Sequence, residues 1–243
     1  MVLRFLGIML AVLVHSHAMA TSASSASIQV VTGNLPPYAY VKDERLEGVA
    51  TDIVREIMRR VGHEKPIRTE PWKRTVTKSV SGRLSFPFAR IPPREGKYKW
   101  IGPILQDSFS FATLESDEAT YLSSDDFKAK TIGVNRGAPT AGRLKKMGFE
   151  NINEARSESA NVKMLQAKRI DGWYSTRLMI QSHMGKEGAP FKVAYDDLPI
   201  EMYVAASLDI PDSIVEKWQA ALDKMKEDGT YEAILDRHSV RLP

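Results

Sequence analysis

Two arginines lie four residues apart in a proline-broken loop, the segment PFARIPPREGKYKWIGP at residues 87–103. Arg90 and Arg94 each carry a planar guanidinium, a group that can hold a carboxylate through two parallel hydrogen bonds. Two such groups among apolar residues and beside Trp100 indicate a pocket that grips an organic acid. The alternative is an ion pair between Arg94 and a surface acid such as Glu95. Which arginine would make the primary contact stays open.

The N-terminus has the composition of a signal peptide. A basic start with Arg4 precedes an apolar run at residues 5–14, and the motif AMA that ends at Ala20 is typical of a cleavage site. About ten apolar residues are too few to span a bilayer, which takes about 20, so an uncleaved anchor is the disfavoured alternative. We expect a signal peptide at residues 1–20, a flexible Ser- and Ala-rich linker at 21–27, and an exported protein.

Composition narrows the classes of function. The chain has 243 residues, no cysteine and a formal net charge of +4. Without cysteine, disulfides, thiolate metal sites and cysteine nucleophiles are excluded together. Basic and acidic residues are nearly balanced along the chain, whereas nucleic-acid binding favours a concentrated basic face, so we expect no nucleic-acid partner.

Apolar periodicity predicts two series of alternating strands and helices. In the first series we expect strands at residues 28–32, 67–70 and 84–88, and helices at 49–61 and 72–80. In the second we expect strands at 131–134 and 170–174, and helices at 140–147 and 161–167. Extended segments at 108–114 and 202–206 and a helix at 214–225 complete the pattern. The fold class is therefore α/β, with a mostly parallel sheet whose ligand would bind beyond the carboxyl ends of the strands.

Two such series joined by two extended crossings would form two lobes around a hinge, with a cleft between them. We predict lobe 1 at residues 28–110, lobe 2 at 111–201, and a C-terminal return to lobe 1 at 202–243.

Several motifs, in order, resemble the bacterial extracellular solute-binding proteins of family 3, the receptors of polar amino-acid ABC transporters. The matching segments are NLPPYAY at 34–40, TDI at 51–53, PWKR at 71–74, RIPPRE at 90–95, WIGP at 100–103, VNRG at 134–137 and KEDGTY at 226–231. Each match is weak alone, but their order and spacing cover essentially the whole exported chain. The resemblance implies a type II periplasmic-binding-protein fold with a ligand cleft between two α/β lobes.

The resemblance also implies which residues hold a carboxylate. In this family an arginine that closes a T-x-x-R pattern does so, and that position is Arg94, although Ile91 replaces the threonine. The turn after the strand at 131–134 supplies Arg136 and Gly137. Thr140 follows at a helix N-terminus, an end that attracts anions.

A missing acid bears on the ligand's identity. Amino-acid binders of this family keep an aspartate about five residues after the position of Asp171, for the ligand ammonium, but this chain has Thr176 there. A buried ammonium without a counter-charge is costly, so an amine-free carboxylate becomes a credible ligand beside an amino acid. Tyr38 and Trp72 lie where the family places rings against the ligand, with packing beneath the loop as the alternative. The predicted ligand-binding residues are Arg94, Arg90, Tyr38, Trp72, Arg136, Gly137, Thr140 and Thr176.

We therefore expect a periplasmic solute-binding protein that closes on a small carboxylate ligand and delivers it to an inner-membrane ABC permease. We expect no cofactor, metal or catalytic residues, because the chain lacks the common catalytic and nucleotide-binding motifs. We also expect the protein to act as a monomer, as is usual for a chain of this type. Two alternatives remain. One is an enzyme on the same fold, similar to the cyclohexadienyl dehydratases, for which Glu70 is the carboxylate to test. The other is the ligand-binding part of a membrane sensor.

Overall fold

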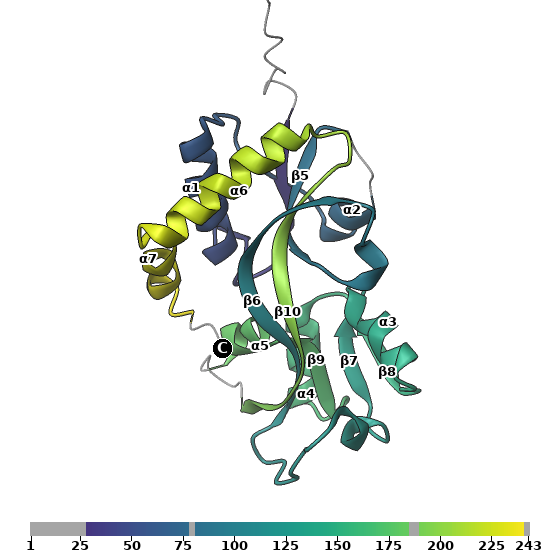
Figure 1. Cartoon of the computed structure of the whole chain (residues 1–243). Coiled ribbons are helices and arrows are strands. Elements are labelled where there is room, and N and C mark those ends of the chain that lie inside the picture. Colours follow the sequence, from purple (N-terminus) through teal and green to yellow (C-terminus); the bar gives the residue numbers. More distant parts are fainter. Residues whose placement is uncertain (1–27, 78–80, 185–189, 241–243) are drawn as a thin grey trace, which may run out of the picture.

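The computed structural model describes residues 28–77, 81–184 and 190–240 (Figure 1). The predicted signal peptide and linker, residues 1–27, lie outside this part of the chain. Within it, no helix combines the length and the apolar character that crossing a membrane requires.

One mixed sheet of eight strands runs through the molecule in the order β4-β1-β5-β10-β6-β9-β7-β8. Its two central strands, β6 (Lys99–Leu114) and β10 (Phe191–Ala206), are 16 residues long each and pair antiparallel along most of their length (Figure 1). On the β10 side lie β5 (Arg83–Ala89), β1 (Gln29–Thr32) and β4 (Arg68–Thr69). On the β6 side lie β9 (Gly172–Thr176), β7 (Ile132–Asn135) and β8 (Ile152–Ala155).

The helices form two groups at the two ends of this sheet (Figure 1). Around β1, β4 and β5 lie α1 (Val49–Val61), α2 (Trp72–Thr77), α6 (Asp212–Glu227) and α7 (Thr230–Arg237). Around β7, β8 and β9 lie α3 (Pro139–Lys146), α4 (Glu158–Gln166) and α5 (Arg177–His183). We call the first group lobe 1 and the second lobe 2. A hairpin of β2 (Tyr40–Lys42) and β3 (Arg45–Glu47) and the short helices η2 (Pro92–Arg94) and η3 (Ser124–Phe127) complete the fold.

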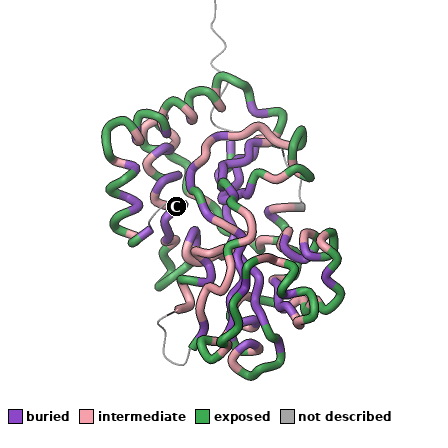
Figure 2. The backbone as a smooth tube through the Cα atoms, turned by 60° about the horizontal axis from the view of Figure 1, so that its bottom comes forward, coloured by how far each residue is buried: buried purple, intermediate pink, exposed green. Residues whose placement is uncertain are grey.

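The core follows the strands, and the outer faces of the helices are exposed (Figure 2). In α1, Val49, Ile53 and Ile57 are fully buried and recur every four residues, which places them on one face against the sheet. Gly62 ends this helix in a left-handed conformation with φ 72°. The sequence pattern alone thus specifies both the buried face and the end of the helix.

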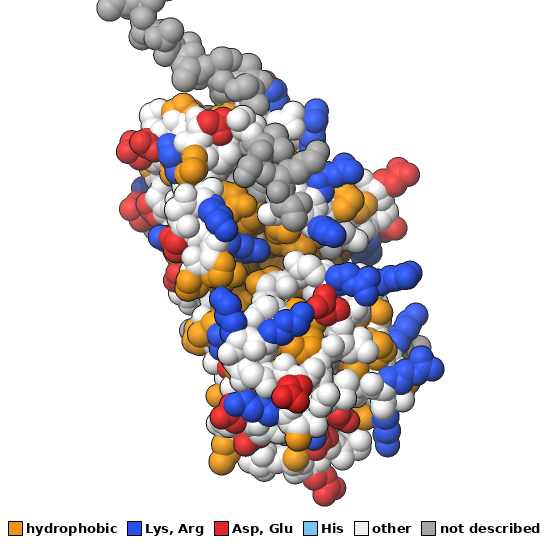
Figure 3. All heavy atoms as spheres, turned by 90° about the vertical axis from the view of Figure 1, so that its right-hand side faces the viewer, with side chains coloured by type: hydrophobic (Ala, Val, Ile, Leu, Met, Phe, Trp, Pro, Cys, Tyr) orange, Lys and Arg blue, Asp and Glu red, His pale blue; other side chains and the backbone are white. Residues whose placement is uncertain are grey.

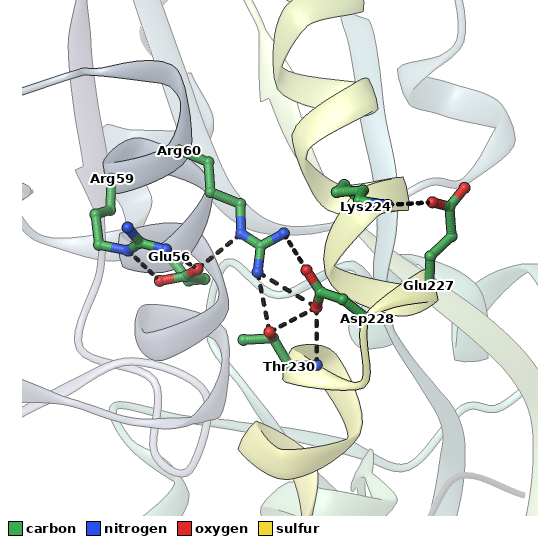
Figure 4. Close-up of polar contacts among 7 residues, drawn as sticks. All are labelled: Glu56, Arg59, Arg60, Lys224, Glu227, Asp228 and Thr230. Carbon is green, nitrogen blue, oxygen red and sulfur yellow. Dashed lines mark hydrogen bonds and ion pairs between the residues drawn. The ribbon is translucent and has the colours of Figure 1, made fainter.

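Within lobe 1, charged contacts join the C-terminal helices α6 and α7 to α1 (Figure 4). The guanidinium of Arg60 in α1 donates from Nε to Glu56 at 2.7 Å and from Nη1 to Asp228 at 2.7 Å. Its Nη2 also donates to the hydroxyl of Thr230 at 2.9 Å. Hydrogen bonding to Arg60 lowers the pKa of Asp228 well below its usual range. One arginine therefore joins α1 to the junction of α6 and α7.

The expected α/β class and most expected elements are confirmed. Parallel pairing holds within each lobe, but the long central pair is antiparallel, so the sheet is mixed rather than mostly parallel. Four features were missing from the sequence-based pattern: the hairpin of β2 and β3, β8, α5 and α7. In addition, α4 begins at Glu158 rather than at Asn161. The predicted lobe boundaries at residues 110 and 201 fall inside β6 and β10 and stay a prediction.

Candidate ligand-binding site

A pocket of about 70 Å³ lies where the two lobes meet. Five of the eight predicted binding residues line it: Tyr38, Trp72 and Arg94 from lobe 1, and Thr140 and Thr176 from lobe 2. Two further lining residues matter below, the aromatic Phe109 and the carboxylate Glu158. The pocket is thus built by residues far apart in the sequence, which the fold brings to one point.

Arg94 brings a cation without an anion to this pocket. Its Nη1 donates to the carbonyl oxygen of Ala89 at 2.8 Å, and its guanidinium carbon lies 4.8 Å from the ring centroid of Phe88. Among the residues that the structure describes, no carboxylate forms an ion pair with Arg94. Burial lowers the pKa of the guanidinium, which remains charged at neutral pH. A partly buried, uncompensated guanidinium favours an anionic ligand.

Thr140 supplies a hydroxyl that is also without a partner. It is the second residue of α3 after Pro139, is only 4% exposed, and its Oγ1 forms no hydrogen bond within the described part of the chain. The first backbone N–H groups of a helix have no intrahelical acceptor, and the helix dipole makes this end favourable for anions. Thr140 and the start of α3 therefore offer hydrogen-bond donors that suit an anion, as the guanidinium of Arg94 does.

Glu158 brings the opposite charge to the same pocket. It is the first residue of α4, and its carboxylate accepts hydrogen bonds from Trp173 Nε1 at 2.8 Å, Ser175 Oγ at 3.1 Å and Asn161 Nδ2 at 3.4 Å. No Lys or Arg of the described chain pairs with it. Burial raises the pKa of this carboxyl, because the three neutral donors only partly replace the water that it has lost.

Tyr38 is held by the start of α1. The backbone N–H of Ala50 donates to the carbonyl oxygen of Tyr38 at 2.9 Å, and that of Val49 donates to the carbonyl of Pro37 at 3.2 Å. Gly48 makes this approach possible: it has φ +120°, and a Cβ on it would lie 2.3 Å from the Tyr38 carbonyl oxygen. The ring of Tyr38 is buried, so the loop that precedes the hairpin has a fixed position.

The hydroxyl of Tyr38 meets groups from outside its own lobe. It donates to the carboxylate of Asp107 in β6, and its oxygen lies 2.6 Å from Oγ1 of Thr176. Asp107 Oδ1 also accepts from the backbone N–H of Ser108 at 2.7 Å and of Leu178 at 3.2 Å. Burial raises the pKa of Asp107 to about 6, and burial together with this carboxylate raises the pKa of Tyr38.

Trp72 forms an aromatic wall of the pocket. It begins α2 and packs against Gly33, where an added Cβ would lie 3.0 Å from the indole Cε3 atom. Its ring meets Phe88 edge to face at a centroid distance of 5.3 Å. Phe88 in turn lies beneath Arg94, so one aromatic residue supports both the indole and the guanidinium.

Three predicted residues lie outside this pocket. Arg90 pairs with Glu95 at 2.8 Å and packs over Trp100 and Tyr203, so the surface ion pair considered for Arg94 is made by Arg90 instead. Arg136 is exposed and donates to the carbonyl of Glu154 at 3.1 Å.

The third of these residues, Gly137, has φ +81° in the turn before α3 and lines a neighbouring groove.

Glu70, the carboxylate considered for catalysis, forms an ion pair with Arg83 and accepts a hydrogen bond from the hydroxyl of Thr75. Its negative charge is therefore already compensated within lobe 1.

The sequence analysis did not identify two carboxylates at the site, Glu158 and Asp107. The expected helix began at Asn161, which left Glu158 in a loop. The available signal was Ser157, which caps the helix by accepting from the N–H of Ala160 at 3.2 Å. Asp107 lies in a strand that continues into an alternating polar and apolar segment, and nothing local distinguishes it from a solvated residue.

Within the described residues, no cluster of His, Cys, Asp or Glu could hold a metal ion. The site instead offers one cation, Arg94, and one anion, Glu158, and neither has a partner of opposite charge among the described residues. Such a pair complements a small molecule that carries both charges.

Comparisons with known proteins assign this chain to a family. The family model described as bacterial extracellular solute-binding proteins, family 3, matches residues 28–240. The probable amino-acid-binding protein YxeM of Bacillus subtilis is 22% identical over 215 residues, which cover 85% of this chain and 81% of that protein.

Solved structures share the fold. A histidine kinase sensor domain with similarity to periplasmic binding proteins superposes with a TM-score of 0.77 at 14% identity, covering 86% of this chain and 95% of the other. The arginine-, lysine-, histidine-binding protein ArtJ of Geobacillus stearothermophilus gives 0.74 at 15% identity, covering 88% and 96%. The predicted type II periplasmic-binding-protein fold is confirmed, and the chain belongs to the bacterial extracellular solute-binding proteins of family 3.

Proposed function

We propose that this protein is a periplasmic receptor that closes its two lobes on a small carboxylate ligand and delivers that ligand to an ABC permease. It acts as a monomer, because each lobe contributes its half of the site within one chain. The ligand carboxylate lies between Arg94 of lobe 1 and the start of α3 in lobe 2. Amino-acid binding by relatives such as YxeM supports this class of ligand.

One observation carries the proposal: Arg94 and the hydroxyl of Thr140 line the same pocket, and within the described chain Arg94 has no anionic partner and the Thr140 hydroxyl has no hydrogen-bond partner. Because they come from different lobes, one carboxylate that satisfies both also joins the lobes. A ligand shifts a hinge equilibrium only through contacts that the closed state adds, and this shared carboxylate is such a contact.

The second charge in the pocket extends the proposal to an amine. Thr176 leaves the usual position of the family's aspartate neutral, but Glu158 offers a carboxylate from the start of α4. A ligand ammonium that approaches Glu158 would gain a charge-assisted hydrogen bond and compensate a partly buried anion. We therefore favour an amino acid over the amine-free acid that Thr176 alone suggested.

A paired screen tests both parts. The exported protein is titrated by calorimetry with L-alanine and propionate, L-phenylalanine and 3-phenylpropionate, and L-glutamate and glutarate. We expect binding within the set and a preference for the amine-bearing member of each pair. If none of the six compounds binds, the proposal that this protein is a receptor for small carboxylates is contradicted. Equal binding within the pairs would leave the receptor intact and remove Glu158 from the recognition of the ligand.

Signalling is the alternative to delivery to a permease, and one structural comparison supports it. The sensor domain of a histidine kinase shares this fold over 95% of its length. Signalling through a membrane sensor would use the same closed state, and co-purification with a permease or with a kinase distinguishes the two.

A further inference from the structure

A groove of about 620 Å³ adjoins the ligand pocket. The two cavities share the lining residues Arg94, Phe109, Ala138 and Pro139. Two other surface cavities, one around Arg83 and one around Arg90, share no lining residue with the pocket. A ligand whose carboxylate lies against Arg94 therefore has this groove as the adjoining space for the rest of the molecule.

Apolar side chains from both lobes form the walls of the groove. Ile91, Pro92 and Pro93 line it from lobe 1, Pro139 from the start of α3 and Met147 from the residue that follows α3, and Leu198 of β10 also lines it. Figure 3 shows apolar side chains in the hollow at the waist of the molecule, with Lys and Arg side chains on both sides of it. The groove thus has the apolar surface and the size of a ligand-binding cleft.

The charges that line the groove have one sign. Its charged residues are Arg94, Lys97, Arg143 and Lys146, with no Asp or Glu among them. Arg143 is neutralised by Asp197, 2.8 Å from its Nη2.

The two lysines of the groove, Lys97 and Lys146, belong to opposite lobes. Both are exposed, Lys97 next to η2 in lobe 1 and Lys146 at the end of α3 in lobe 2. Neither forms an ion pair with a described residue. Two ammonium groups without an ion pair therefore border an apolar groove from its two sides.

We propose that this groove selects ligands with a bulky apolar side chain that ends in an anion, a choice that rests on the proposed function of the pocket. The apolar part of the ligand side chain buries the apolar walls of the groove, and its terminal carboxylate lies between Lys97 and Lys146. A cationic side chain would meet two like charges and no acid to compensate it. In this respect the groove would differ from the site of the arginine-, lysine-, histidine-binding protein ArtJ.

Three amino acids share the α-amino and α-carboxylate groups and the phenyl ring and differ only in the charge at the end of the side chain: L-phenylalanine, 4-carboxy-L-phenylalanine and 4-aminomethyl-L-phenylalanine. Their affinities separate the apolar from the charged contribution. Calorimetric titration at 50 mM and 500 mM NaCl should rank them carboxy, unsubstituted, aminomethyl in falling affinity. Two solvent-exposed ion pairs correspond to a gain of roughly tenfold for the carboxy compound over phenylalanine, which high salt should reduce. The reverse rank, or equal affinities, would overturn the proposal for the groove while leaving the pocket's function standing.

The double variant K97Q/K146Q should bring the carboxy and unsubstituted compounds to within about threefold of each other. K145Q is the matched control, since Lys145 neighbours Lys146 on α3 but pairs with Glu154 and does not line the groove. Its ligand rank should equal that of the unmodified protein. If the double variant keeps the full preference for the carboxy compound, the lysines do not select the ligand. If none of the three compounds binds, the proposed pocket fails and this inference with it.

Discussion

The hydroxyl oxygen of Tyr38 in lobe 1 lies 2.6 Å from the hydroxyl oxygen of Thr176 in lobe 2. The same phenol donates to Asp107, which lies in a strand that runs through both lobes. Asp107 also accepts from the N–H of Leu178 in lobe 2. Lobe 1, the crossing strand and lobe 2 therefore meet in one small hydrogen-bonded group at the edge of the ligand pocket, and we expect this group to favour the closed arrangement.

Replacing Tyr38 with phenylalanine should weaken both closure and stability. The variant keeps the ring but leaves the buried carboxylate of Asp107 without its phenol donor. The expected loss is about 1.5 to 3 kcal/mol of unfolding free energy, the usual range for a hydrogen bond to a charged group. Urea denaturation measures this loss, and calorimetry should show a weaker affinity for the best ligand of the paired screen. Unchanged values in both would show that the group does not stabilise the closed form.

Stability should fall as the pH rises through the range in which Asp107 ionises. Its pKa is about 6 in the fold, above its ordinary value of 3.8, because burial disfavours the charged form. The folded protein therefore keeps a proton between about pH 4 and pH 6 that the unfolded chain releases. In this window the contribution of Asp107 to the unfolding free energy decreases by about 2 to 3 kcal/mol as the pH rises, and it is constant above it.

The variant D107N isolates this effect from other titrating groups. Asparagine is neutral at every pH, so the stability of D107N relative to the unmodified protein should rise between pH 4 and pH 7. Urea denaturation at the two pH values gives the two differences. A difference that is the same at both would mean that Asp107 ionises in the fold as it does in water.

Replacing Gly48 with alanine should displace Tyr38. The added Cβ would overlap the Tyr38 carbonyl, and φ +120° is unfavourable for alanine. We expect a loss of about 2 to 4 kcal/mol of unfolding free energy and weaker ligand binding. G62A is the control: Gly62 also has positive φ, but nothing lies within 4 Å of its Cβ position, so about 1 kcal/mol should be lost with affinity preserved. Equal effects of the two variants would contradict the role of Gly48 in placing the loop.

Replacing Glu158 with glutamine should remove the preference for an amine. The amide has nearly the same shape but no charge, so amino-acid affinity should fall roughly tenfold to a hundredfold, while amine-free acids should be unaffected or bind better. Because burial raises the pKa of Glu158, amino-acid binding to the unmodified protein should also weaken as the pH falls. Calorimetry with L-phenylalanine and 3-phenylpropionate measures both effects. An equal loss for the two compounds would indicate a structural role for Glu158.

Much of the fold could be predicted because local patterns specify it. Helix α1 was expected at its observed bounds, since its apolar residues recur on one face and Gly62 ends it. The length of β10 could not be predicted, because a hinge strand is half exposed over its first part and carries no continuous apolar signal. Pairing of β10 with β6 is likewise a property of the whole chain rather than of either segment.

The site was predictable where a family motif marks it. Arg94, Thr140, Tyr38, Trp72 and Thr176 were all expected, and all line the pocket. Arg90 could not be separated from Arg94 by sequence, because the direction of each side chain depends on the turn at η2, which places Arg90 beside Glu95. Whether any of these residues binds the ligand stays a prediction.

Titration of R94A and R90A with the tightest ligand of the paired screen tests the central claim most directly. Arg94 lines the pocket and pairs with no acid of the described chain, whereas Arg90 pairs with Glu95 outside the pocket. The two variants therefore remove the same charge from the same loop but only R94A removes it from the pocket. Truncating one partner of a buried charge pair costs about 2 to 5 kcal/mol, so R94A should lose at least about thirtyfold in affinity, and R90A should stay within about threefold of the unmodified protein. Full affinity in R94A, in a protein that is still folded, would contradict this account of the site.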